Sequence, residues 1–249
     1  MPSPVKTSFD APDRAGDLAK RERPPVGPDR PLRDGLLAFA AVTAVVSLLY
    51  RLRGVPFVER NLAVVAAVLF LYVPAALLWR RGAELEQYGL RARPLLRGLL
   101  WAGLAMGIVF PPFAGGYFLY ISRAWAWLAG RLPWHCPPSL PLALRLPPDP
   151  LMAVLSQLLV VALPEEFFFR GYLQGRLSEI LPLRKSLLLT ATLFALGHFL
   201  VTFDPAALAV FFPGLAFGLL RHYTGSVLAG TLFHAACNLF MEILRRSMG

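Results

Sequence analysis

The sequence predicts an all-α fold, a polytopic transmembrane helical bundle of about seven spans with eight as the alternative. Hydrophobic residues make up 56% of the 249 positions and charged residues only 16%. The apolar residues come in long blocks rather than in alternation, which a soluble core would not need. The basic residues gather between these blocks, where they set the orientation of helices at lipid headgroups.

Seven apolar blocks follow one another and are long enough, or nearly so, for the roughly 17 to 25 residues that a span requires. Four prolines should kink or interrupt their helices, which a membrane tolerates because neighbouring groups satisfy the freed carbonyls. The third block extends toward residue 129 as one broken helix or two pieces, so eight spans stay open. The blocks are residues 35–50, 61–79, 98–122, 151–181, 186–202, 205–220 and 226–244, and the prolines are Pro74, Pro111, Pro112 and Pro213.

Residues 1–34 differ from the rest in composition. They contain seven Lys or Arg, six Asp or Glu and seven Pro, so they bury too little apolar surface to fold. We expect a disordered cytoplasmic tail, followed by a transmembrane domain over residues 35–249. With the N-terminus inside, 17 Lys and Arg fall on the inner side and eight on the outer side, which fits the positive-inside rule.

The same charge distribution bears on partners and localisation. Because the basic residues lie between apolar blocks, they indicate contact with the lipid bilayer and not with nucleic acid. The chain has 22 Arg and only 3 Lys, a usage that is typical of GC-rich bacterial genomes. We therefore expect an integral protein of a bacterial cytoplasmic (inner) membrane.

Small residues predict where helices approach closely. Gly171 and Gly175, and likewise Gly214 and Gly218, have the i,i+4 spacing that permits tight packing in lipid. Asp204 stands directly before a proline, which predicts a helix N-cap followed by Pro at the first helical position.

Polar residues form three constellations inside otherwise apolar stretches. Ionisable groups are costly in lipid-facing sequence and mark a functional site by default. Two carboxylates, two imidazoles and a carboxamide are the inventory of a buried hydrolytic site. The constellations comprise Glu165, Glu166 and Arg170, then Phe194 and His198, and finally His234 and Asn238.

Groups on separate helices can cooperate only at one depth in the bilayer. If the fourth block is one continuous helix, Glu165 lies ~25 Å from the inner end, His198 ~18 Å, His234 ~14 Å and Asn238 ~20 Å. These positions agree within about two helical turns. A helix that stopped at Pro164 would instead separate Glu165 and His198 across the membrane, so a single site requires the long helix.

Helical spacing places the two glutamates on different faces of the helix and predicts different roles for them. Glu166 and Arg170 are i,i+4 and share a face, which suits an ion pair, whereas Glu165 points about 100° away. Glu165 is then free to act as general base, and His198 can hold the attacking water with it.

His234 and Asn238 are also i,i+4 and can present two donors to an oxyanion. Each residue type also has a structural explanation: a Glu–Arg pair can brace helices, a lone His can be a hydrogen-bonded core residue, and an Asn can join helices. Phe194 is expected to pack and shape the pocket. The coincidence of the whole set favours a site.

At these residues the chain resembles the CPBP family of intramembrane proteases, the CaaX proteases and bacteriocin-processing (Abi) proteins. The family's motifs stand here as Glu165-Glu166-Phe-Phe-Phe-Arg170, Phe194-Ala-Leu-Gly-His198 and His234-Ala-Ala-Cys-Asn238. The similarity covers about residues 150–243, which we take as the catalytic core.

The resemblance implies an intramembrane endopeptidase in which Glu165 and His198 activate water and His234 and Asn238 form the oxyanion hole. Glu166 and Arg170 carry over as supporting residues. It implies a glutamic-type mechanism with no metal; a zinc ion held by Glu165, His198 and His234 is the alternative.

The family's substrates are prenylated C-termini, leader peptides, or the C-terminal sorting tails processed by the myxosortase-type branch. For this chain the resemblance implies a peptide or protein substrate with a membrane-embedded or membrane-proximal cleavage site. Two other classes compete. An ion-coupled transporter predicts an inverted repeat, whereas here the polar groups fall in the second half. A catalytically silent membrane scaffold predicts gaps in the motifs, and every motif position is filled.

Overall fold

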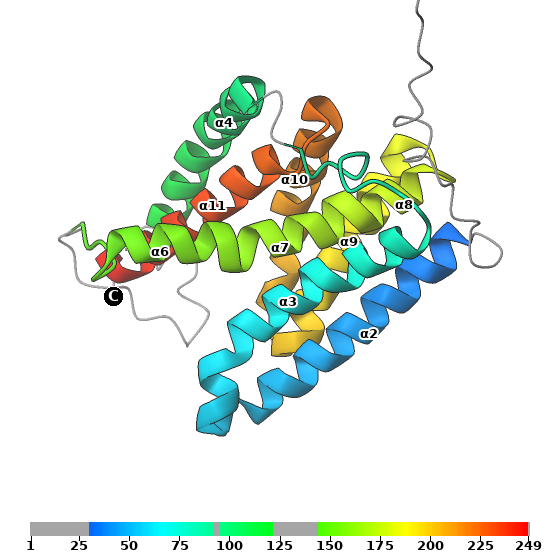
Figure 1. Cartoon of the computed structure of the whole chain (residues 1–249). Coiled ribbons are helices and arrows are strands. Elements are labelled where there is room, and N and C mark those ends of the chain that lie inside the picture. Colours follow the sequence, from blue (N-terminus) through cyan, green and yellow to red (C-terminus); the bar gives the residue numbers. More distant parts are fainter. Residues whose placement is uncertain (1–29, 92–94, 122–143, 249) are drawn as a thin grey trace, which may run out of the picture.

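The computed structural model describes residues 30–91, 95–121 and 144–248, which form an all-helical bundle (Figure 1). Within those residues, six helices are long and apolar enough to cross a membrane. These are Pro31–Gly54, Pro56–Arg80, Leu96–Gly116, Pro150–Ser178, Leu183–Thr202 and Pro205–Thr224. A seventh long helix, α11 (Leu228–Met248), follows as the last described element. The predicted all-α membrane bundle is confirmed.

The helices follow the predicted apolar blocks closely. The first pair is α2 (Pro31–Arg51), which runs into the short η1 (Leu52–Gly54), and α3 (Pro56–Arg80). They are followed by α4 (Leu95–Ile121), by α9 (Leu183–Thr202), and by η4 (Pro205–Val210) leading into α10 (Phe211–Thr224). Residues 1–29 and 122–143 lie outside the described residues, so neither that part of the predicted tail nor the choice between seven and eight spans is tested. Residues 31–34, predicted to belong to the tail, form the first turn of α2.

The fourth apolar block is one continuous helix, as a single site requires. It consists of α6 (Pro150–Ser156), η2 (Gln157–Ala162), α7 (Leu163–Glu166), η3 (Phe167–Leu173) and α8 (Gln174–Ser178). The segments η2 and η3 have the wider turns of a π-helix, which occur often at functional sites. Asp149 caps the start, because its carboxylate accepts a hydrogen bond from the Met152 amide at 3.0 Å.

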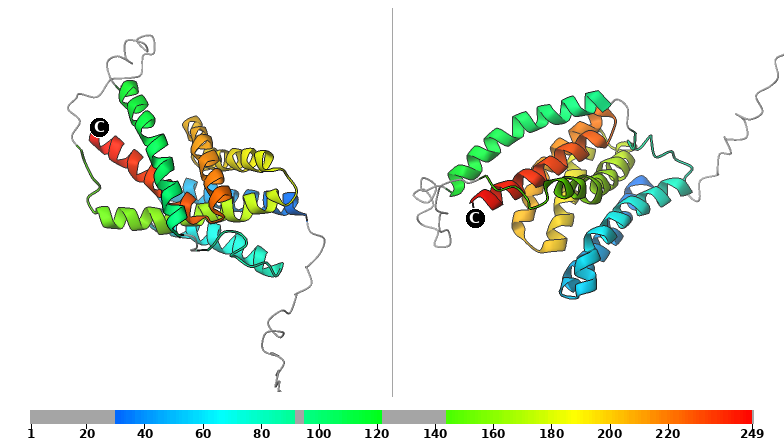
Figure 2. Two further views of the ribbon diagram at one scale, coloured as in Figure 1. Left: turned by 90° about the horizontal axis from the view of Figure 1, so that it is seen from above. Right: turned by 60° about the vertical axis from the view of Figure 1, so that its left-hand side comes forward.

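This long helix crosses the middle of the bundle (Figure 1). On one side, α2 and α3 pack against each other; on the other, α4 packs against α11 (Figure 2). Helices α9 and α10 pack together and contact the central helix. The central helix therefore touches helices from both sides, and a side chain in its middle can meet side chains from several of them.

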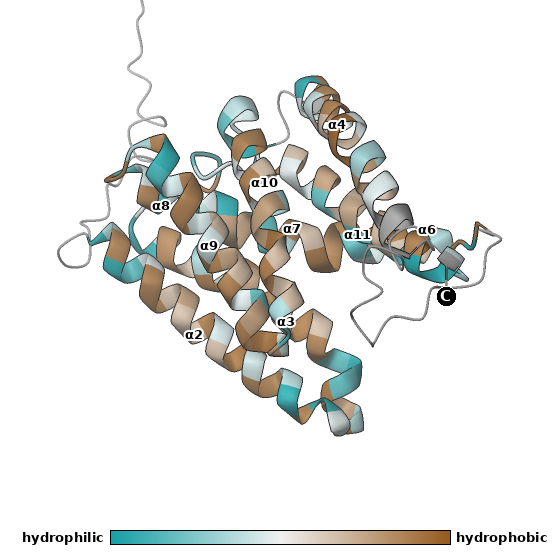
Figure 3. Cartoon of the chain, turned by 180° about the vertical axis from the view of Figure 1, so that it is seen from behind, coloured by the Kyte–Doolittle hydropathy of each residue, from teal (hydrophilic) through white to brown (hydrophobic). Residues whose placement is uncertain are grey.

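The surface has the character of a membrane protein. Coloured by hydropathy, the long helices are mostly brown along their lengths, and hydrophilic residues gather toward their ends (Figure 3). Large apolar side chains point outward, among them Leu37, Tyr72, Leu100, Ile108 and Phe212. Outward-facing apolar residues along whole helices are what a lipid environment favours. The chain is an integral membrane protein.

None of the four prolines interrupts its helix. Pro74 lies inside α3, and Pro111 and Pro112 lie inside α4, which continues past both. Pro213 is the third residue of α10, where an amide proton is not needed for the helical ladder. Asp204 caps η4 as predicted, since its carboxylate accepts a hydrogen bond from the Ala206 amide at 2.9 Å.

Both glycine pairs allow close packing, one against a helix and the other against a loop. A Cβ on Gly218 would lie 2.6 Å from Leu187, so α10 packs closely on α9 there as predicted. A Cβ on Gly175 would lie 2.8 Å from the Tyr88 ring, and one on Gly171 would lie 2.8 Å from the Tyr88 carbonyl oxygen. Gly171 and Gly175 therefore pack against the loop between α3 and α4 rather than against another helix.

Tyr88 anchors that loop to the central helix. Its hydroxyl donates a hydrogen bond to Glu179 at 2.8 Å. Burial, and next the bond to Glu179, raise the pKa of Tyr88 above its ordinary value. The phenol therefore remains a neutral donor at neutral pH.

Candidate active site

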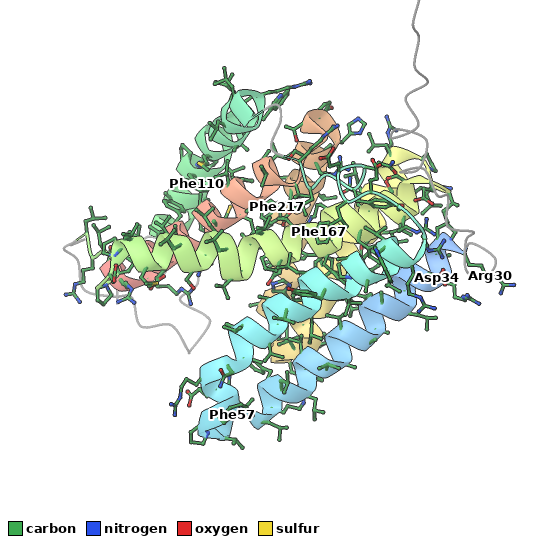
Figure 4. All side chains as sticks on the ribbon, in the orientation of Figure 1. Arg30, Asp34, Phe57, Phe110, Phe167 and Phe217 are labelled. Atoms are coloured by element: carbon green, nitrogen blue, oxygen red, sulfur yellow. The ribbon has the colours of Figure 1, made fainter. Side chains whose placement is uncertain are left out.

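The three motifs meet where the central helix passes between α9 and α11. Glu165, Glu166 and Arg170 come from the central helix, Phe194 and His198 from α9, and His234 and Asn238 from α11. Figure 4 shows the side chains of this region, with Phe167 on the central helix and Phe217 on α10 labelled nearby. The structure thus brings together motifs that are separated by tens of residues in the sequence.

Glu165 lies between the two imidazoles. Its Oε2 atom is 3.8 Å from His198 Nε2 and 3.9 Å from His234 Nε2. Both distances are too long for direct hydrogen bonds, and Glu165 Oε2 has no hydrogen-bond partner in the described part of the chain. The His198 side chain is 33% exposed and that of His234 is 6% exposed, so the site opens on the His198 side.

The other nitrogen of each imidazole is already engaged. His198 Nδ1 is 2.9 Å from the Phe194 carbonyl oxygen, and His234 Nδ1 is 3.0 Å from Glu166 Oε1. Since both partners are acceptors, both Nδ1 atoms carry the proton, and the Nε2 atom of each neutral ring is an acceptor. The Phe194 ring contacts His198 edge-on, with the centroids 4.5 Å apart, so Phe194 packs against this imidazole.

Glu166 and Arg170 form the predicted ion pair. Arg170 Nη1 lies 3.0 Å from Glu166 Oε1, and both side chains are fully buried. Arg170 Nη2 also donates to the Gly214 carbonyl oxygen on α10 at 3.2 Å. Its guanidinium carbon lies 4.1 Å from the centre of the Phe194 ring and 5.0 Å from that of Phe217, so cation–π contacts add to the ion pair.

Two contacts and one close approach at this site were not predicted from the sequence. Gln157 Oε1 accepts a hydrogen bond from Asn238 Nδ2 at 2.9 Å. The Phe217 ring stacks on the His234 imidazole, with the centroids 4.7 Å apart and the planes 13° apart. At Gly230 an added Cβ would lie 2.8 Å from Glu166 Oε2. Gln157 could have been found, because it is a polar residue inside the fourth apolar block.

The alternative zinc ligands are Glu165, His198 and His234, and these three side chains do face one another. Within the described residues, however, no group of three or more His, Cys, Asp or Glu side chains has the arrangement that could hold a metal ion. Glu166 bonds to His234 in the manner of the carboxylates that orient metal-binding histidines. The same bond equally orients an imidazole that acts without a metal.

Comparison with known proteins relates this part of the chain to one family. Residues 147–240 match the model of the family described as "Type II CAAX prenyl endopeptidase Rce1-like". Comparison with curated proteins and with solved structures gives no match. The matched residues include the long central helix, α9, α10 and the part of α11 that carries His234 and Asn238. The chain therefore carries a domain of the Rce1-like type II CAAX prenyl endopeptidase family, a family of proteases.

Proposed function

We propose that this protein is an intramembrane endopeptidase in which Glu165 activates the water that attacks the peptide bond. The observation that carries the proposal is the position of Glu165 Oε2, 3.8 Å from His198 Nε2 and 3.9 Å from His234 Nε2. Two polar atoms at this separation can share one water molecule, each at an ordinary hydrogen-bond distance of about 2.8 Å.

The proton positions favour Glu165 and His198 as the pair that holds the water. The Glu165 carboxylate can accept one hydrogen bond from the water. His198 Nε2 can accept the other, because its Nδ1 atom donates to the Phe194 carbonyl. The water then donates both hydrogens and directs a lone pair at the substrate carbonyl. Glu165 takes a proton as the bond to carbon forms and returns it to the leaving amine.

His234 and Asn238 would stabilise the negative oxygen of the tetrahedral intermediate. One amide hydrogen of Asn238 is given to Gln157, which leaves the second free to donate. His234 can donate from Nε2 only when both ring nitrogens carry protons, since Nδ1 faces Glu166.

Gln157 is a positioning residue in this scheme, and its substitution makes a specific prediction. Asn238→Ala should lower kcat by about 10²- to 10³-fold, the usual loss of one oxyanion donor. Gln157→Ala should lower kcat by less, with KM unchanged, because the Asn238 amide remains but is no longer held. Gln157→Asn keeps an uncharged acceptor oxygen on a shorter side chain and should lose less of the rate than Gln157→Ala. The measurement is kcat and KM of each purified variant on one cleaved substrate.

The double variant Gln157→Ala/Asn238→Ala is the control for that scheme. If Gln157 acts only through Asn238, the double variant should be no slower than Asn238→Ala alone. If the losses in kcat of the two single variants multiply in the double variant, Gln157 and Asn238 do not act as one unit.

The substrate we propose is a peptide segment at or inside the membrane, either a leader peptide or a C-terminal sorting tail of the kind processed by the myxosortase-type branch. Glu165 lies in the middle of a helix that is long and apolar enough to span the membrane, so the scissile bond has to reach this depth. Arg-rich composition supports a bacterial cytoplasmic membrane, where prenylated substrates are not expected. The distribution of Lys and Arg supports a cytoplasmic N-terminus.

The mechanism needs no metal and therefore predicts insensitivity to chelation. Protein purified through a strong chelator should keep its full rate and contain much less than one zinc ion per chain. Restoration of a lost rate by added zinc alone would instead assign Glu165, His198 and His234 as zinc ligands. Metal content by mass spectrometry and the rate are measured on the same sample.

A further inference from the structure

A second polar site lies at one end of the bundle, away from Glu165. The loop of residues 81–91 crosses from the end of α3 over α8 to the ends of α10 and α11 (Figure 1). The Val227 amide donates to the Gly89 carbonyl at 2.9 Å, and the Ser226 hydroxyl donates to the Arg91 carbonyl at 2.7 Å. These bonds hold the loop against the turn between α10 and α11.

Two arginines complete this junction by reaching across it. Arg91 Nε donates to the Gly225 carbonyl at 2.9 Å, and Arg221 Nη2 donates to the Gln87 carbonyl at 3.3 Å. The Arg221 guanidinium occupies the space that a Cβ at Gly89 would need, and Gly89 has a φ of 89°. The Arg91 guanidinium likewise occupies the Cβ position of Gly225, which has a φ of 68°. The backbone on both sides is thus shaped around the two charged side chains.

The two guanidiniums have no negative partner within the residues that the structure describes. Their hydrogen bonds go to neutral carbonyls, which accept protons but cancel no charge, and the two positive charges repel each other. Arg221 Nε is buried and has no hydrogen-bond partner among the described residues.

Glu84 and Glu86 lie in the same loop, but among the described residues neither forms an ion pair with Arg91 or Arg221. Two further carboxylates at this end of the bundle already pair with other arginines. Asp34 pairs with Arg81, and Glu179 pairs with Arg176 at 2.6 Å. The arginine pair therefore carries a charge that no described carboxylate compensates, and a bound anion would compensate it.

The depth of the pair indicates which anion. Tyr223, two residues from Arg221, is exposed and stacks on Trp101 of α4 with the ring centroids 5.3 Å apart. Trp and Tyr concentrate at the level of lipid headgroups. Basic pockets between transmembrane helices bind acidic headgroups, and the planar guanidinium fork matches phosphate oxygens. We propose that Arg91 and Arg221 bind the phosphate of an anionic phospholipid headgroup.

The test uses the full chain purified in a mild detergent. Phosphatidylglycerol should raise the melting temperature in a concentration-dependent way, and phosphatidylcholine should not. Loss of both arginines in Arg91→Gln/Arg221→Gln should weaken the affinity for phosphatidylglycerol about thirty-fold, at the usual contribution of each basic residue near an acidic headgroup. Arg184→Gln is the matched control, because Arg184 is an exposed arginine at the start of α9 on the same face.

Each outcome has a definite meaning. An equal loss in Arg184→Gln would show a general attraction of lipid to a basic surface and overturn the site. Equal protection by inorganic phosphate at matched concentration would assign a free anion and overturn the lipid. Unchanged affinity in the double variant would overturn the role of the arginines. If the double variant fails to fold, Arg91→Gln alone, which retains Arg221, should still lose about five-fold, and full retention there would contradict the proposal.

Discussion

Replacing either Glu166 or Arg170 by Ala should lower the free energy of unfolding by about 3 to 5 kcal/mol, the usual cost of breaking a buried ion pair. The two side chains are 3.0 Å apart and fully buried, so removal of one leaves the other charged and without its main partner. Loss of Glu166 also removes the acceptor of His234 Nδ1. Both variants should aggregate at lower temperature in detergent, measured in one melting series with wild type.

Glu165→Ala is the matched control, because it removes a neighbouring glutamate that has another task. Glu165 Oε2 accepts no hydrogen bond from the described residues, so its loss breaks none there. We expect this variant to melt at or above the wild-type temperature, since removal of a strained active-site group often stabilises a fold. A series in which Glu165→Ala melted lowest while Glu166→Ala and Arg170→Ala matched wild type would reverse the two assignments.

Glu165→Gln and His198→Ala should abolish processing while membrane insertion and expression stay near normal. The amide of Gln has the shape of the carboxylate but cannot accept the proton from water, and loss of a general base costs about 10²- to 10⁴-fold in rate. His198→Ala removes the second acceptor for the same water. The rate is measured on purified protein, with the amount of folded protein from size-exclusion chromatography as the control. Full activity of Glu165→Gln would remove Glu165 as the base.

Most of the fold follows from patterns that are local in sequence. Long apolar blocks predict the spanning helices because each block satisfies its own backbone hydrogen bonds in lipid. The Glu166–Arg170 pair follows from i,i+4 spacing on one helix, and the structure forms it with a distance of 3.0 Å. The common depth of the motifs required a continuous helix through Pro164, which the structure has.

The contacts that were not predicted join residues distant in sequence. Gln157 and Asn238 are 81 positions apart, and Glu166 and His234 are 68 apart. No helical period relates them, because they meet only through the packing of the central helix against α11. For the same reason, the sequence assigned Gly171 and Gly175 to helix packing, whereas Tyr88 of a loop fills that space.

Comparison of membrane-protein termini in the native host tests most directly whether Glu165 drives proteolysis. Wild type and Glu165→Gln are expressed at equal levels, and the N- and C-termini of membrane proteins are compared by mass spectrometry. We expect at least one membrane protein to carry a new terminus, at or near its apolar segment, only with wild type. Identical termini in the two strains, with both proteins folded in the membrane, would contradict the proposed role of Glu165 in proteolysis.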